Sequence, residues 1–176
     1  QCVTPHLGAV TAPLDGIVVI SLEQAVSAPY ATRLLADLGA RVIKVERPDG
    51  DFARDYDTAV AGQSSFFVWT NRGKSSTVLD LHREADRSHL ATLITGADVF
   101  VQNMAPAAAT RLGLTGDQLR ATHPALIACD ISGYGPGGPR DGDRAYDLAI
   151  QAEAGAWTLL GGDPGKIGFS AADITT

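Results

Sequence analysis

The sequence has 176 residues, of which 45% are hydrophobic and 19% are charged, and 20 acidic residues outnumber 14 basic ones to give a formal net charge of −6. These values are typical of one globular domain with a sizeable core, and the acidic balance argues against nucleic acid as the main partner. No stretch approaches the roughly 20 consecutive apolar residues that a membrane-spanning helix needs.

The N-terminus and the cysteines indicate a cytoplasmic protein that has no membrane partner. Residues 1–12 lack the basic start and apolar core of a signal peptide, so we expect a tail there and a single domain at 13–176. The two cysteines, Cys2 and Cys129, are too few for a disulfide framework. Cys129 stands in an apolar run, and because free cysteines are commonly buried, we expect it to be a small core residue.

The first long apolar stretch predicts a strand, a helix and a second strand. Residues 17–20 form an unbroken apolar run, typical of a strand that is buried on both faces. Apolar residues recur at helical spacing over 28–38, with Ser27 expected as the N-cap and Gly39 just past the end. Residues 41–46 predict a second strand. The three elements predict a right-handed βαβ unit with parallel strands, which binds ligands at the carboxyl ends of its strands.

Strands and helices continue to alternate along the rest of the chain. Residues 51–70 are expected to be irregular, and the Gly/Pro-rich loop at 133–142 is either a connector or a ligand lid. Further strands are predicted at 77–81, 98–102 and 125–132. Further helices are predicted at 83–95, from 106 to about 111, at 115–123 and at 145–154. The fold class is therefore α/β with a mainly parallel sheet flanked by helices.

The residues alone indicate a domain that could bind a nucleotide-like anion. The G-x-G-x-x-G dinucleotide motif is missing, so Glu46, at the end of the second strand, is weak evidence for a dehydrogenase. No P-loop, GxSxG elbow or zinc spacing appears, and the histidines are scattered singly, so we expect no metal. Each basic residue near a predicted strand end is either a ligand for a phosphate or a solvated charge. These residues are Arg47, Arg72, Lys74, Arg111, Arg140 and Arg144.

Six segments, taken together and in order, resemble the class III CoA-transferase family, which includes formyl-CoA:oxalate and carnitine CoA-transferases and the related α-methylacyl-CoA racemases. The segments are residues 13–51, 71–81, 97–114, 123–139, 145–155 and 170–176. The resemblance covers nearly all of the chain from Pro13 onward. It implies a Rossmann-like, CoA-binding domain that corresponds to the N-terminal portion of these enzymes.

The resemblance also implies a set of site residues, with CoA or acyl-CoA as substrate. In the transferases an aspartate in a segment like SAADITT is the nucleophile, so this role is carried over to Asp173; without the resemblance, Asp173 could be a helix N-cap. Arg111 and Arg144 match positions where family members carry basic residues near the CoA phosphates. The adenine and ribose would lie near Arg47, Leu79, Leu81, Asn103, Met104 and Ala108.

Two positions depart from patterns within the family. The racemases carry an acid/base histidine where this sequence has Tyr146, which favours a transferase and places Tyr146 at the catalytic site. Formyl-CoA:oxalate enzymes carry a glutamine at the CoA site where this sequence has Val26, which argues against oxalate specificity.

The expected function is CoA transfer between an acyl-CoA thioester and a free carboxylic acid, through aspartyl-acyl anhydride and aspartyl-CoA intermediates. Family members continue well beyond the point matching residue 176 and pair as interlocked dimers. We therefore expect this chain to be incomplete and inactive alone, with a homodimer or a second chain supplying the remainder. Two alternatives stay open: an acyl-CoA racemase or epimerase that uses Asp173 with another base, and a non-catalytic CoA-binding module that needs a partner chain.

Overall fold

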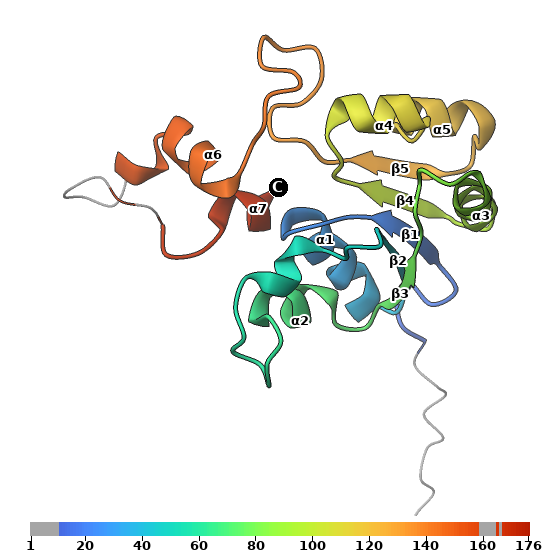
Figure 1. The fold of residues 1–176 in the computed structure, drawn as a ribbon, viewed down its shortest axis with the longest axis horizontal. Coiled ribbons are helices and arrows are strands. Elements are labelled where there is room, and N and C mark those ends of the chain that lie inside the picture. Colours follow the sequence, from blue (N-terminus) through green and yellow to red (C-terminus); the bar gives the residue numbers. More distant parts are fainter. Residues whose placement is uncertain (1–10, 159–164, 166) are drawn as a thin grey trace, which may run out of the picture.

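The computed structural model describes residues 11–158, 165 and 167–176, and it confirms the α/β class (Figure 1). Within these residues one sheet contains five parallel strands in the order β3-β2-β1-β4-β5. The strands are β1 (Val18–Leu22), β2 (Arg41–Glu46), β3 (Ser75–Val78), β4 (Val99–Gln102) and β5 (Ile127–Asp130). The strand order reverses between β1 and β4, and ligands of open α/β sheets bind at such a point, outside the carboxyl ends.

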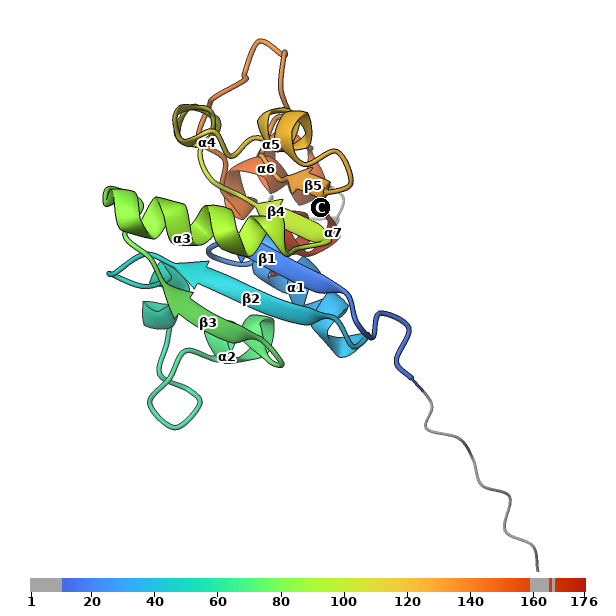
Figure 2. The same cartoon turned by 90° about the vertical axis from the view of Figure 1, so that its right-hand side faces the viewer.

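Helices cover both faces of the sheet. They are α1 (Ser27–Asp37), α2 (Ser65–Asn71), α3 (Glu84–Thr95), α4 (Pro106–Leu112), α5 (Gly116–Thr122), α6 (Asp147–Glu153) and α7 (Ala171–Thr175), with 3₁₀ turns η1 (Phe52–Asp55) and η2 (Ala156–Thr158). Figure 2 shows α3 over one face and α1 behind the other. Successive strand residues point to opposite faces, so Val19 packs with Ala28 of α1, whereas Ile20 and Phe100 pack with Leu90 of α3.

Local structure departs from the sequence expectations in three places. Residues 51–70 are not irregular throughout, because η1 forms there and Ser64 caps α2 by accepting a hydrogen bond from the Phe67 N–H. Strand β3 occupies 75–78 rather than 77–81, in register with β2. Helix α1 begins at Ser27, and its N-cap residue is Val26, which makes no side-chain cap bond.

The expectation that Cys129 is a core residue is wrong, because its side chain is exposed. Strand β5 is an edge strand, and Ile127, two residues earlier and so on the same face, is 65% exposed. Within the described part of the chain, neither side chain is covered by another element. An apolar run therefore predicted the strand correctly but overestimated the burial of one of its faces.

After β5 the chain leaves the sheet and forms a separate group of short helices. Figure 1 shows α6 set apart from the sheet, beyond the carboxyl ends of the strands, while α7 returns toward the body. Helix α7 contacts both α6 and α1. The part of the chain with described structure contains no helix of the length and apolarity required to cross a membrane.

Candidate active site

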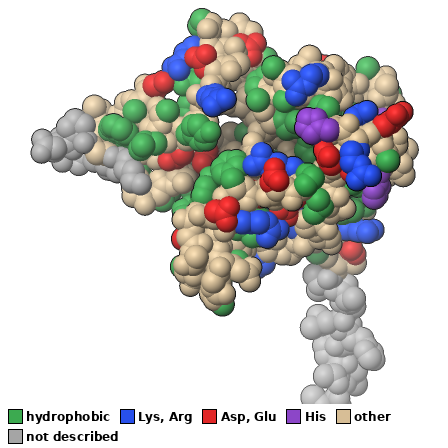
Figure 3. Space-filling model, viewed as in Figure 1, with side chains coloured by type: hydrophobic (Ala, Val, Ile, Leu, Met, Phe, Trp, Pro, Cys, Tyr) green, Lys and Arg blue, Asp and Glu red, His purple; other side chains and the backbone are tan. Residues whose placement is uncertain are grey.

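A cavity of about 370 Å³ lies outside the carboxyl ends of the strands. Its lining comes from the loops that follow β1, β4 and β5, from residues 142–147 and from α7. Figure 3 shows the molecular surface hollowed between the body that holds the sheet and the segment that holds α6 and α7. The cavity thus occupies the position where parallel α/β sheets bind their ligands.

Asp173 enters this cavity from α7, and α6 holds its backbone. The Oδ1 atom of Asp147 accepts hydrogen bonds from the backbone N–H groups of Ala172 at 2.8 Å and Asp173 at 3.3 Å. Its Oδ2 atom accepts a 2.7 Å hydrogen bond from Gln151 Nε2. Gln151 is only 3% exposed and also bonds the backbone of Phe169 and Ile167. Two α6 side chains therefore fix the segment that carries Asp173.

The carboxyl group of Asp173 has an unusual electrostatic environment. Burial raises the pKa of Asp173 to about 6, and the nearby carboxylate of Asp147 adds to the shift. The group is still mostly ionised at pH 7, but it is less well solvated than a surface carboxylate. A partly desolvated carboxylate on a backbone that is held in place beside a cavity can act as a nucleophile or as a general base.

The loop between β1 and α1 forms another part of the lining and is fixed from two sides. The side chain of Asn103 accepts a 2.9 Å hydrogen bond from the Gln24 N–H and donates a 2.8 Å bond to the Gln24 carbonyl. Asp51 Oδ1 accepts hydrogen bonds from the N–H groups of Ala25 at 3.1 Å and Ala53 at 2.9 Å. Ala25 has a φ of +65°, which is uncommon for a residue other than glycine. These hydrogen bonds hold the loop in a strained conformation beside the cavity.

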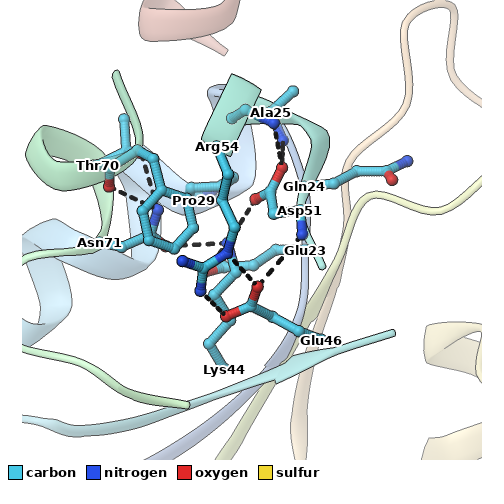
Figure 4. Close-up of polar contacts among 12 residues, drawn as sticks. Glu23, Gln24, Ala25, Pro29, Lys44, Glu46, Asp51, Arg54, Thr70 and Asn71 are labelled. Carbon is cyan, nitrogen blue, oxygen red and sulfur yellow. Dashed lines mark hydrogen bonds and ion pairs between the residues drawn. The ribbon is translucent and has the colours of Figure 1, made fainter. Parts of the chain in front are cut away.

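A cluster of charged residues packs beneath this loop, on the α1 side of the sheet (Figure 4). Lys44 Nζ lies 2.6 Å from Asp51 Oδ2, and Lys74 Nζ lies 2.6 Å from Glu23 Oε1. Both lysine side chains are almost fully buried. The charged cluster comprises Glu23, Lys44, Glu46, Asp51, Arg54 and Lys74. Its three acidic and three basic groups balance, as burial requires.

The charged cluster changes the interpretation of several basic residues. Lys74 is buried against Glu23, so this lysine is not a surface ligand for phosphate. Burial also lowers the pKa of Lys74 to about 8, although the Glu23 carboxylate opposes that shift. Arg72 pairs with Asp37, and Arg140 pairs with Asp143 and Glu153. In the described residues, Arg47, Arg111 and Arg144 make no ion pair with a carboxylate.

Comparison with known proteins identifies the family. A family model described as CoA-transferase family III matches residues 14–176. This chain belongs to CoA-transferase family III. The resemblance inferred from the six segments is thereby confirmed.

Relatives of this family III chain include proteins from several bacteria. An acetyl-CoA:oxalate CoA-transferase of Acetobacter aceti is 40% identical over 160 residues, which cover 89% of this chain and 41% of the relative. A succinate–glutarate CoA-transferase of Agrobacterium fabrum is 35% identical, over 93% of this chain and 44% of the relative. The solved structure of a CAIB/BAIF family protein from Brucella suis is 37% identical in sequence and superposes with a TM-score of 0.87. The match covers 93% of this chain and 46% of the Brucella suis chain. The chain thus spans less than half the length of these relatives.

The cavity of the family III chain brings together five residues that the sequence singled out. Asn103, Met104, Arg144, Tyr146 and Asp173 all line it. Arg144 and Tyr146 are exposed, whereas Asn103 and Met104 are partly buried where the chain leaves β4. These five come from three separate stretches of sequence.

The other predicted site residues do not line this cavity. Val26 is 2% exposed and Leu79 is 4% exposed, and both belong to the core. Arg47 and Arg111 are exposed on the surface, and Ala108 is half-buried on α4.

Leu81 borders a second, more apolar cavity of about 230 Å³. That cavity lies between α3 and the α4–α5 segment, and His123 and Arg87 are among its few polar lining residues. It lies apart from Asp173, which lines only the first cavity.

The sequence reasoning missed the residues that hold the site in place. Asp147 and Gln151 are four apart in α6, a spacing that lets helical side chains contact each other and could have been noticed. Asp51 and Gln24 offered no comparable signal, since their roles depend on contacts between loops that are distant in sequence.

Proposed function

We propose that this chain forms the CoA-binding part of a CoA-transferase and carries its nucleophile, Asp173. The observation that carries the proposal is the partly buried Asp173, whose backbone is held by Asp147, in a cavity that also contains Arg144 and Tyr146. Membership of CoA-transferase family III supports the reaction class. Tyr146 favours transfer over racemisation, because a phenol is a much weaker base than a histidine at neutral pH.

The reaction begins when an Asp173 carboxylate oxygen attacks the thioester carbonyl of the donor acyl-CoA. The carbon–sulfur bond breaks, leaving an aspartyl-acyl anhydride and the CoA thiolate. The thiolate then attacks the aspartyl carbonyl, which releases the donor acid and forms an aspartyl-CoA thioester. The acceptor carboxylate attacks that thioester and displaces the thiolate, and the thiolate finally attacks the acceptor's carbonyl to regenerate Asp173. Each step exchanges one acyl bond for another, so no oxidant or reductant is needed.

The CoA phosphates are proposed to lie near Arg144, with Arg111 contributing from α4. Both guanidinium groups are exposed, and neither makes an ion pair within the described residues, so both are available to an anion. Replacing both with Ala should weaken CoA binding by roughly 1.5–3 kcal/mol for each charge-assisted hydrogen bond that the substitution removes. Calorimetry with CoA would measure this decrease. The matched control is Arg120→Ala, which removes an exposed arginine paired with Asp117; equal affinity in the double variant and this control would move the phosphates elsewhere.

We propose small carboxylic acids as acceptors, because relatives are named for oxalate and for succinate and glutarate. The test supplies the intact protein with acetyl-CoA or succinyl-CoA that is labelled in its CoA moiety, together with an acceptor panel of oxalate, succinate and glutarate. Label transferred to CoA esters of the panel acids supports a transferase. Exchange of the α-proton of an α-methylacyl-CoA, supplied in a parallel assay, without transfer would instead identify a racemase. The native mass of the active species would show whether a second copy or another chain is required, and we expect the 176 residues alone to show no turnover.

The pH dependence of transfer should report the ionisation of Asp173. Because burial and Asp147 raise the pKa of Asp173 to about 6, the nucleophilic carboxylate is present above that pH and is lost as the pH falls through it. We therefore expect kcat/KM to decline below about pH 6, whereas an ordinary aspartate would stay ionised to about pH 4. Asp147→Asn removes the neighbouring charge but keeps an oxygen for the backbone N–H groups, so it should move this decline to lower pH. A decline at the same pH in both proteins would show that another group controls it.

A further inference from the structure

The cavity contains polar side chains that the protein already uses and others that it leaves available. Several lining side chains are engaged in hydrogen bonds within the protein, and Asn103 and Asp147 are the most heavily used. Among the described lining residues, the side chains of Gln24, Ser27, Arg144, Tyr146 and Asp173 make no hydrogen bond to other residues. Tyr146 is assigned to the catalytic site, and Ser27 has a single hydroxyl donor. Asp173 is the reacting group and Arg144 is assigned to CoA. The carboxamide of Gln24 therefore remains as a hydrogen-bonding group to which no ligand has been assigned.

The backbone of Gln24 is held more firmly than that of an ordinary loop residue. Its N–H and its carbonyl both bond to Asn103, and the next N–H, of Ala25, bonds to Asp51. Asp51 is 4% exposed and is held in turn by Lys44. The left-handed backbone of Ala25 is the kind of strain that persists only where surrounding contacts enforce it, and such strain concentrates at functional sites.

The side chain of Gln24 points away from the charged cluster (Figure 4). Because Gln24 lines the same cavity as Asp173, this direction leaves its carboxamide available to a ligand there. Helix α1, which begins three residues after Gln24, contacts α7, so the two lining segments are structurally connected. A side chain whose backbone is held in this way is suited to recognising a ligand with defined geometry.

We propose that Gln24 is a specificity-determining residue whose amide hydrogens bind the carboxylate of the acceptor acid. The inference rests on the proposed function and names a contact for its second substrate. When the acceptor acid reacts, Asp173 is held as its CoA thioester, but the cavity still contains the carboxyl groups of Asp143 and Asp147, so repulsion opposes binding of the acid unless donors compensate. The amide of Gln24 supplies two N–H donors without a charge. The uncharged amide can therefore orient the acceptor acid. A cationic side chain at this position would instead form an ion pair with Asp173 and make its carboxylate a weaker nucleophile.

The test is steady-state transfer by the intact enzyme, with the acid of the acceptor panel that the wild type uses fastest. Gln24→Ala should raise the KM for that acid about tenfold, the effect of losing one hydrogen bond to a charged group. Gln24→Glu should raise it further, because it adds another carboxylate to the cavity. The KM for acyl-CoA should stay within about twofold in both variants, since CoA is assigned to other residues. Gln63→Ala and Gln63→Glu are the matched controls, because Gln63 is an exposed glutamine that does not line the cavity.

The outcomes separate this inference from the function on which it rests. If the wild type transfers CoA but both Gln24 variants keep its KM for the acid, the assignment of Gln24 is wrong. A rise confined to the KM for acyl-CoA would place Gln24 in the CoA site and would also overturn the assignment. Failure of the wild type to transfer CoA to any panel acid would instead overturn the proposed function itself.

Discussion

Replacing Asp173 with Asn or Ala is expected to reduce CoA transfer by the intact enzyme on the order of 10³-fold or more, because the proposed nucleophile is removed. Binding of CoA should remain measurable, since Arg144 and the loops after β1 and β4 are unaffected. Asp173→Asn keeps nearly the same volume, so its loss of activity would not reflect a packing defect. Transfer rates and calorimetric CoA affinity, measured on the same preparations, separate the two effects.

Asp117→Asn is the matched control for this experiment. Asp117 is on the surface of α5, its side chain is 92% exposed, and it does not line the cavity. The control should transfer CoA at the wild-type rate. Turnover by Asp173→Ala at a rate close to that of Asp117→Asn would show that the nucleophile is another group.

The second large effect is a decrease in the free energy of unfolding, expected when Lys44 is replaced. Lys44 Nζ lies 2.6 Å from Asp51 Oδ2, 3.0 Å from Asn71 Oδ1 and 3.9 Å from Glu23 Oε1. Lys44→Met retains the aliphatic volume but leaves the buried Asp51 carboxylate without its closest cation. Removing one partner of a buried ion pair typically lowers the free energy of unfolding by about 3–5 kcal/mol. Urea titration of the intact protein should show a decrease of this size.

Arg120→Met provides the comparison with an exposed ion pair. Arg120 pairs with Asp117 on the surface of α5, and exposed pairs of this kind contribute roughly 0–1 kcal/mol. The free energy of unfolding should therefore change by less than about 1 kcal/mol in this variant. Equal decreases in Lys44→Met and Arg120→Met would mean that the charged cluster does not stabilise the fold as its burial indicates.

The sheet was predictable because its strands carry strong local signals. The apolar run at 17–20 and the helical spacing over 28–38 fall within or beside β1 and α1, and β2 matches its predicted bounds. Helix α2 was missed because its seven residues are mostly aromatic or β-branched, and its formation depends on the Ser64 cap. The burial of a strand face depends on what packs against it, which is why exposure of Cys129 could not be predicted.

The candidate site was only partly predictable, for a different reason. Family resemblance located Asp173, Arg144 and Tyr146, which the structure places around one cavity. The residue types alone could not show that Lys74 is buried against Glu23, since the two are 51 residues apart. Contacts of this kind are determined by the way the loops pack, and no local pattern in the sequence predicts them.

The most direct test of the proposed nucleophile is chemical trapping of the intermediate on Asp173. The intact enzyme is incubated with acyl-CoA and then with hydroxylamine, which attacks the aspartyl-CoA thioester, displaces CoA and leaves a hydroxamate on the side chain. Peptide mass analysis should find this modification at Asp173 in the wild type, with no modification of that peptide in Asp173→Asn or when acyl-CoA is omitted. Continued transfer of CoA with Asp173 unmodified, or a hydroxamate on a different carboxylate, would contradict the proposed mechanism.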